Sequence, residues 1–117
     1  MIEDIAVVSV WAEDVAETAH FYRDVLGLKL LPLHHHAGRP HFKLGGAYLT
    51  ILKGKPQPAE DSEPSRFPIF ALRASDLDQA VVRLQAHDVD LPWGVEGQGE
   101  SRWVMFHDPA GNLIELT

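Results

Sequence analysis

Hydrophobic and polar positions follow the same order in both halves of the chain. Residues 5–12 (IAVVSVWA) and 67–74 (FPIFALRA) are apolar, and the first run is rich in β-branched side chains, as is typical of buried strands. Each run is followed by an aspartate, Asp14 or Asp76, a residue type that often begins a helix. Apolar residues then recur at helical spacing: Val15, Ala19, Tyr22 and Leu26 in the first half, and Leu77, Ala80, Val81 and Leu84 in the second.

Short apolar runs separated by turn residues come after each helix. In the first half Gly27 ends the helix, and the following runs are 28–36 (LKLLPLHHH), 41–46 (HFKLGG) and 47–54 (AYLTILKG). In the second half they are 89–101, which is Gly-rich and irregular, 102–106 (RWVMF) and 112–117 (NLIELT). The last two are joined by HDPAG, in which Pro109 sets the turn and Gly111 supplies a positive φ.

The order of elements predicts an α+β fold built from two pseudo-symmetric βαβββ modules. Module one covers residues 1–54 and module two residues 66–117, within a single domain of residues 1–117. The segment 55–65 is acidic and has three prolines, as a linker would. Each helix covers one face of its sheet, so we expect the other two faces of this mixed sheet to curl together into a cup with the helices outside.

Composition limits the partners of the chain. Seventeen acidic residues against ten Lys and Arg give a net charge of −7, which disfavours a nucleic-acid partner and suits a neutral or cationic small ligand. The absence of cysteine excludes disulfides and thiolate metal sites. No leader opens the sequence and no apolar run is long enough to span a bilayer, so we expect a cytoplasmic protein without a membrane partner.

Three segments together are similar to a known family, the vicinal oxygen chelate superfamily. They are VWAEDVAETAHFYRDVLGLKLL, ALRASDLDQAVVRLQAHDV and FHDPAGNLIEL, which span nearly the whole chain. The superfamily includes glyoxalase I, extradiol dioxygenases, fosfomycin-resistance enzymes, methylmalonyl-CoA epimerase and bleomycin-resistance proteins. The resemblance implies a cup in which the enzymes hold a metal ion, and it implies a homodimer, the common state of small members.

The positions that carry metal ligands in the family are mostly apolar in this sequence. The resemblance places Val7 and Ile69 where histidines usually stand, and Thr50 and Glu115 at the two last-strand positions. Hydrocarbon side chains offer no lone pair, and one carboxylate with a hydroxyl cannot hold a divalent metal tightly. We therefore expect no metal cofactor, with a divalent metal ion as the alternative.

Glu115 has two interpretations. Alternation alone would place Leu113, Glu115 and Thr117 on the outer face of a strand, whereas the resemblance turns Glu115 into the cup. A carboxylate in an apolar cup suits a general base or a partner for a ligand cation, so Glu115 is the candidate catalytic residue. His34 and His36 share a strand face and could form a metal site with Glu115, but the sequence favours the alternative that they decorate an exposed hairpin.

Side chains alternate between the two faces of a strand, so residues two apart from the family's metal-ligand positions should share their face. This alternation predicts which residues line the cup. Arg73 would need an acidic partner there, either Glu115 or an anionic ligand. The candidate ligand-binding residues are Ser9, Trp11, Tyr48, Thr50, Arg73, Trp93 and Trp103. Two functions stay open: a metal-independent protein that sequesters a small apolar or aromatic ligand, and an enzyme of the glyoxalase or dioxygenase type. A third hypothesis is an accessory domain with a vestigial pocket.

Overall fold

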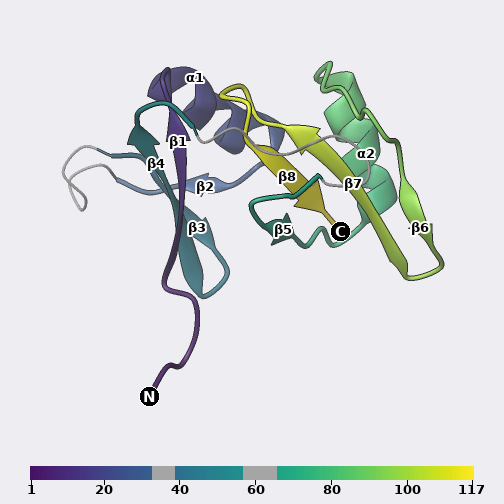
Figure 1. The fold of residues 1–117 in the computed structure, drawn as a ribbon, viewed down its shortest axis with the longest axis horizontal. Coiled ribbons are helices and arrows are strands. Elements are labelled where there is room, and N and C mark those ends of the chain that lie inside the picture. Colours follow the sequence, from purple (N-terminus) through teal and green to yellow (C-terminus); the bar gives the residue numbers. More distant parts are fainter. Residues whose placement is uncertain (33–38, 57–65) are drawn as a thin grey trace. The chain divides into compact units, whose positions relative to one another are not determined.

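The computed structural model describes residues 1–32, 39–56 and 66–117. His34 and His36, and most of the predicted linker, lie outside the described residues. The chain divides into two compact units, Met1–Pro56 (unit 1) and Gln57–Thr117 (unit 2), each with its own sheet and helical segment. Figure 1 shows the elements of both units.

Unit 1 is a four-stranded sheet with a helical segment between its first two strands (Figure 1). In chain order the elements are β1 (Val7–Ala12), α1 (Val15–His20), the π-helical η1 (Phe21–Val25), β2 (Lys29–Leu30), β3 (His41–Leu44) and β4 (Ala47–Lys53). The sheet order is β1-β4-β3-β2, and β1 runs parallel to β4 while the other pairs are antiparallel.

The first helix begins where the sequence predicts and ends differently. The Asp14 carboxylate accepts the Glu17 backbone N–H at 3.0 Å, so the predicted cap is confirmed. The predicted α-helix gives way to a π-helical turn, in which the Leu26 N–H donates to the Phe21 carbonyl. This wider turn buries the neighbours Phe21 and Tyr22 together, and the Tyr22 ring lies 6.0 Å from that of Phe42. Gly27, with φ of 76°, ends the segment as predicted.

Unit 2 repeats the topology of unit 1. Its elements are β5 (Ala71–Leu72), α2 (Leu77–Ala86), β6 (Glu96–Gln98), β7 (Ser101–His107) and β8 (Leu113–Leu116). The sheet order is β5-β8-β7-β6, with β5 parallel to β8. Both sheets therefore place their strands in the spatial order first, fourth, third and second. The predicted α+β fold with two βαβββ modules is confirmed.

Helix α2 also begins at its predicted cap. The Asp76 carboxylate accepts the Gln79 backbone N–H at 3.1 Å. The predicted apolar stripe is the least exposed side of the helix, and Leu84 retains only 2% exposure. Among the described residues, no helix is long and apolar enough to cross a membrane.

Two predicted strands are shorter than expected. The run 28–36 contributes only the two residues of β2 within its described part, and the run 67–74 contributes only the two of β5. Both runs contain a proline, Pro32 or Pro68, whose nitrogen carries no hydrogen for a ladder hydrogen bond. Single backbone bonds extend the pairing, from Leu31 to His41 and from Ile69 to Leu113.

Candidate ligand-binding site

One face of the sheet in unit 1 is covered and the other is open. On β1, Val10 and Ala12 are fully buried on the covered face, with Phe42, Leu49 and Ile51 from the neighbouring strands. Val7, Ser9 and Trp11 alternate with them and are exposed. Their partners in the parallel pairing with β4 are Tyr48, Thr50 and Leu52, which therefore share this open face.

Two aromatic side chains of the open face are exposed yet held in place. The Trp11 ring packs on the α-carbon of Gly54, where a Cβ would come within 2.6 Å of the ring. Tyr48 lies beside Lys43, whose Nζ is 5.0 Å from the centre of the Tyr48 ring. Trp11 is 44% exposed and Tyr48 37%, so both present aromatic surface to a ligand.

Thr50 differs from its neighbours because its hydroxyl is already engaged. The side chain is buried, and Oγ1 donates to the Pro40 carbonyl at 2.9 Å. Nδ1 of His41 lies 3.3 Å from the same oxygen and 3.2 Å from the Arg39 carbonyl. Thr50 therefore fixes the chain that leads into β3, and its hydroxyl proton is not available to a ligand.

Glu115 occupies the position in unit 2 that Thr50 occupies in unit 1. Ser9 pairs with Thr50 across β1 and β4, and Ala71 pairs with Glu115 across β5 and β8. Glu115 is half-buried on β8, and its antiparallel partner Met105 on β7 is buried. Leu113, on the same face, is fully buried, so the carboxylate has apolar neighbours in its own sheet.

A second cluster of unit 2 combines charge and aromatic surface. Arg66 forms an ion pair with Glu96, and its guanidinium stacks 4.2 Å from the centre of the Trp93 ring. Glu96 pairs in register with Trp103 across β6 and β7. Glu96 Oε2 and Trp103 Nε1 are both buried and have no hydrogen-bond partner among the described residues. The sequence indicated the two tryptophans, whereas Arg66 and Glu96 carried no signal of their own.

His107 and His20 do not belong to a cluster of potential metal ligands among the described residues. His107 ends β7 rather than lying in the turn as expected, and its ring is 6.5 Å from that of Trp93. His20 is exposed on α1 and pairs with Asp24, with 2.7 Å between Nδ1 and Oδ2. Neither joins a group of potential ligands: in the described parts of the chain no three His, Asp or Glu side chains gather as a metal site would require.

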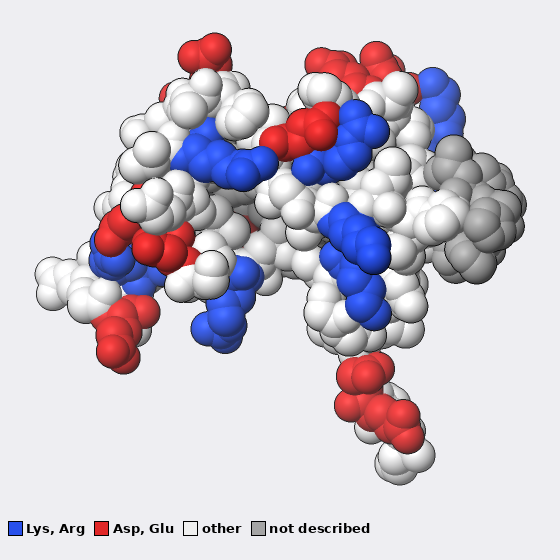
Figure 2. All heavy atoms as spheres, turned by 180° about the vertical axis from the view of Figure 1, so that it is seen from behind, with Lys and Arg blue, Asp and Glu red and all other residues white. Residues whose placement is uncertain are grey.

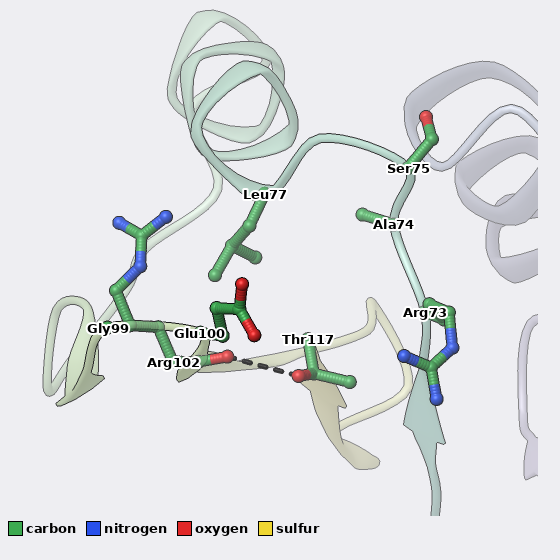
Figure 3. A pocket seen from close by; sticks show the side chains of 8 residues that line it. All are labelled: Arg73, Ala74, Ser75, Leu77, Gly99, Glu100, Arg102 and Thr117. Carbon is green, nitrogen blue, oxygen red and sulfur yellow. Dashed lines mark hydrogen bonds between the residues drawn. The ribbon is translucent and has the colours of Figure 1, made fainter.

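Arg73 lines a polar pocket of about 470 Å³ beside the start of α2 (Figure 3). The other lining residues are Ala74, Ser75, Leu77, Gly99, Glu100, Arg102 and Thr117. The Thr117 hydroxyl donates to the Arg102 carbonyl at 3.0 Å. Arg73 is exposed and follows the end of β5, so solvent can satisfy its charge. Because Arg73 is not buried, it does not need the acidic partner or anionic ligand that the sequence led us to expect.

The second arginine of this pocket is engaged by an acid. Arg102 donates to both carboxylate oxygens of Asp78, at 2.9 and 3.4 Å. Hydrogen bonding and then charge attraction from Arg102 lower the pKa of Asp78 below its ordinary value of 3.8, and Asp78 raises the pKa of Arg102 in turn. Glu100 also lines the pocket, which therefore carries both positive and negative side chains. This mixture favours neither an anionic nor a cationic ligand.

The family positions do not form a donor set that fits a metal ion. Val7 and Ile69 are both exposed hydrocarbon side chains without a lone pair. The Thr50 hydroxyl donates elsewhere, which leaves only the Glu115 carboxylate as a ligand of the usual kind. His34 and His36, the alternative ligands, lie outside the described residues.

The chain has two units of the same topology, each with the strand order first, fourth, third and second. A family model for the Glyoxalase/Bleomycin resistance protein/Dioxygenase superfamily matches residues 4–116. The chain belongs to this superfamily, and the resemblance noted in the sequence is confirmed.

Individual relatives are similar over most of their length. The chain is 30% identical to the uncharacterized protein YaeR of Escherichia coli (strain K12), over 98% of this chain and 95% of the relative. It is 26% identical to the metallothiol transferase FosB of Staphylococcus epidermidis, over 99% and 84%. Among solved structures, TnmS3, an antibiotic binding protein from Streptomyces sp. CB03234, is 25% identical with a TM-score of 0.71, over 99% and 95%.

Proposed function

We propose that this protein binds a small apolar or aromatic organic molecule on the open sheet face of unit 1, and that it does so without a resident metal ion. The observation that carries the proposal is that Val7 and Ile69 have hydrocarbon side chains. They stand at the two positions where the enzymes of the superfamily place metal-binding residues. The exposed rings of Trp11 and Tyr48 supply the aromatic surface that such a ligand needs. TnmS3, named as an antibiotic binding protein, is a structural relative with a binding function.

Binding of a neutral aromatic probe tests this proposal. We expect 1-naphthamide to bind with the same affinity in the presence and absence of EDTA, because hydrocarbon and ring stacking supply the contact. Tyr48→Ala should weaken this binding about tenfold, since it removes one ring of the contact surface. Isothermal titration calorimetry measures both affinities.

Val82→Ala is the matched control for Tyr48→Ala, because Val82 is an exposed apolar residue on α2. Its affinity for 1-naphthamide should equal that of the unchanged protein. Loss of binding in EDTA, or equal losses in both variants, would contradict the proposal.

An enzyme that uses Glu115 as a base is the second candidate function. Its supporting observation is the half-buried carboxylate between the apolar residues Met105 and Leu113. Such a base would abstract a proton next to a carbonyl in the ligand. FosB, named as a metallothiol transferase, shows by its name that the superfamily also contains enzymes.

Glu115→Gln separates the two functions. For a sequestering protein we expect unchanged affinity for 1-naphthamide, because the amide keeps the shape of the carboxylate and the contact is apolar. If a carbonyl compound is turned over by the unchanged protein, the variant should lose that turnover while keeping the ligand bound. Mass spectrometry of the recovered compound gives the answer.

We also propose that the protein is a homodimer. The family resemblance supports this state, and the open sheet face of unit 1, with the exposed apolar residues Val7, Trp11 and Tyr48, leaves surface for a second copy. Light scattering coupled to size exclusion measures the mass directly.

A further inference from the structure

The open face of unit 1 carries only basic charge, although the chain as a whole is acidic. Its strand positions are Val7, Ser9 and Trp11 on β1, Tyr48, Thr50 and Leu52 on β4, His41 and Lys43 on β3, and Lys29 on β2. Among these described strand residues there is no Asp or Glu, while the chain has 17 acidic residues against 10 Lys and Arg. The charge of this face is therefore opposite to the net charge of −7.

Two of the cations stand directly opposite each other. Lys29 and Lys43 are partners in the antiparallel pairing of β2 and β3, and both are exposed. Like charges at directly opposed positions repel, which costs stability relative to a neutral pair. An anion bound between the two ammonium groups would remove that repulsion. Figure 2 shows Lys and Arg side chains gathered above the N-terminal arm, whose own acidic side chains are drawn in red.

The aromatic surface adjoins these cations. Lys43 pairs in register with Tyr48, and its ammonium lies over the Tyr48 ring at 5.0 Å. Val7, Tyr48, Lys43 and Lys29 are paired in one row across the four strands, whereas Trp11 lies four residues further along β1. A flat ring stacked on this surface would bring a negatively charged substituent within reach of the lysines.

We infer that the ligand of the open face in unit 1 is a small aromatic anion, whose ring contacts Tyr48 and whose acidic group lies between Lys29 and Lys43. This inference rests on the proposed function and adds the charge of the ligand. It differs from what the net charge of the chain favours, a neutral or cationic molecule, because local charge on the binding face decides which ion gains from contact.

The test compares two probes of the same shape, 1-naphthoate and 1-naphthamide. We expect 1-naphthoate to bind about tenfold more tightly at low salt, and this preference to shrink as the salt concentration rises. Calorimetry gives the two affinities, and backbone amide shifts by NMR should change at Tyr48 and Lys43.

Lys29→Gln with Lys43→Gln should abolish the preference, so that the variant binds 1-naphthoate no more tightly than 1-naphthamide. Lys55→Gln, which removes one exposed lysine outside the strands, should keep it. Equal affinity for the two probes in the unchanged protein overturns the inference but leaves the proposed function standing. If neither probe binds, both are overturned.

Discussion

Replacing Asp108 by alanine should lower the free energy of unfolding by about 3 kcal/mol. Asp108 is 3% exposed, and its carboxylate organises the turn between β7 and β8. Oδ1 accepts the backbone N–H groups of Ala110 at 3.0 Å and Asn112 at 2.9 Å, and Oδ2 accepts the Asn112 side-chain amide at 2.9 Å. Alanine would leave three donors without an acceptor at a buried turn, and each orphaned buried group costs free energy.

The consequence reaches the candidate site because this turn sets the register of Met105 with Glu115. Urea denaturation of the variant and the unchanged protein measures the stability difference. Asp90→Ala, at an exposed loop position, is the control and should change stability by less than about 0.5 kcal/mol. A loss of similar size in both variants would show that the Asp108 hydrogen bonds contribute little.

Replacing Gly97 by alanine should have an effect of similar size, about 3 kcal/mol. Gly97 lies in β6 with φ of 82°, and an added Cβ would come within 2.0 Å of the Ser101 carbonyl oxygen. It would also meet the Trp103 ring at 2.7 Å. The new methyl group must therefore displace the strand pairing, the ring or both.

Gly99→Ala provides a close control, because Gly99 has φ of 62° and open space around its α-carbon. Alanine at this position would adopt a left-handed backbone conformation, which costs free energy, but its Cβ would meet no other atom. We therefore expect the free energy of unfolding to fall by only about 1 kcal/mol. The NMR resonance of the Trp103 indole N–H should move in the Gly97 variant and stay in place in the Gly99 variant. Equal effects on stability and on this resonance would contradict the collision.

Local chemistry explains why much of the fold could be predicted. Asp14 and Asp76 cap their helices through their own carboxylates, a contact made within three residues of sequence. Gly27 and Gly111 adopt the positive φ that their positions require. Strand alternation placed Val7, Ser9 and Trp11 on one face, as the pairing with β4 confirms.

The parts that were not predicted depend on contacts distant in sequence. The π-helical turn at Phe21–Val25 follows from packing two aromatic neighbours together, which periodicity cannot indicate. The ion pair of Arg66 with Glu96 joins residues far apart in sequence, and neither stands in a recognisable motif. The hydroxyl of Thr50 was expected in the ligand site, yet its bond to the Pro40 carbonyl depends on how β3 meets β4.

The central claim is that ligand binding needs no resident metal, because Val7 and Ile69 replace the usual donors. The most direct measurement is the metal content of protein purified without a histidine tag, by inductively coupled plasma mass spectrometry. The account predicts a content far below one ion per chain. A stoichiometric amount of iron, manganese, nickel or zinc, lost in a variant with His34→Ala and His36→Ala, would contradict it.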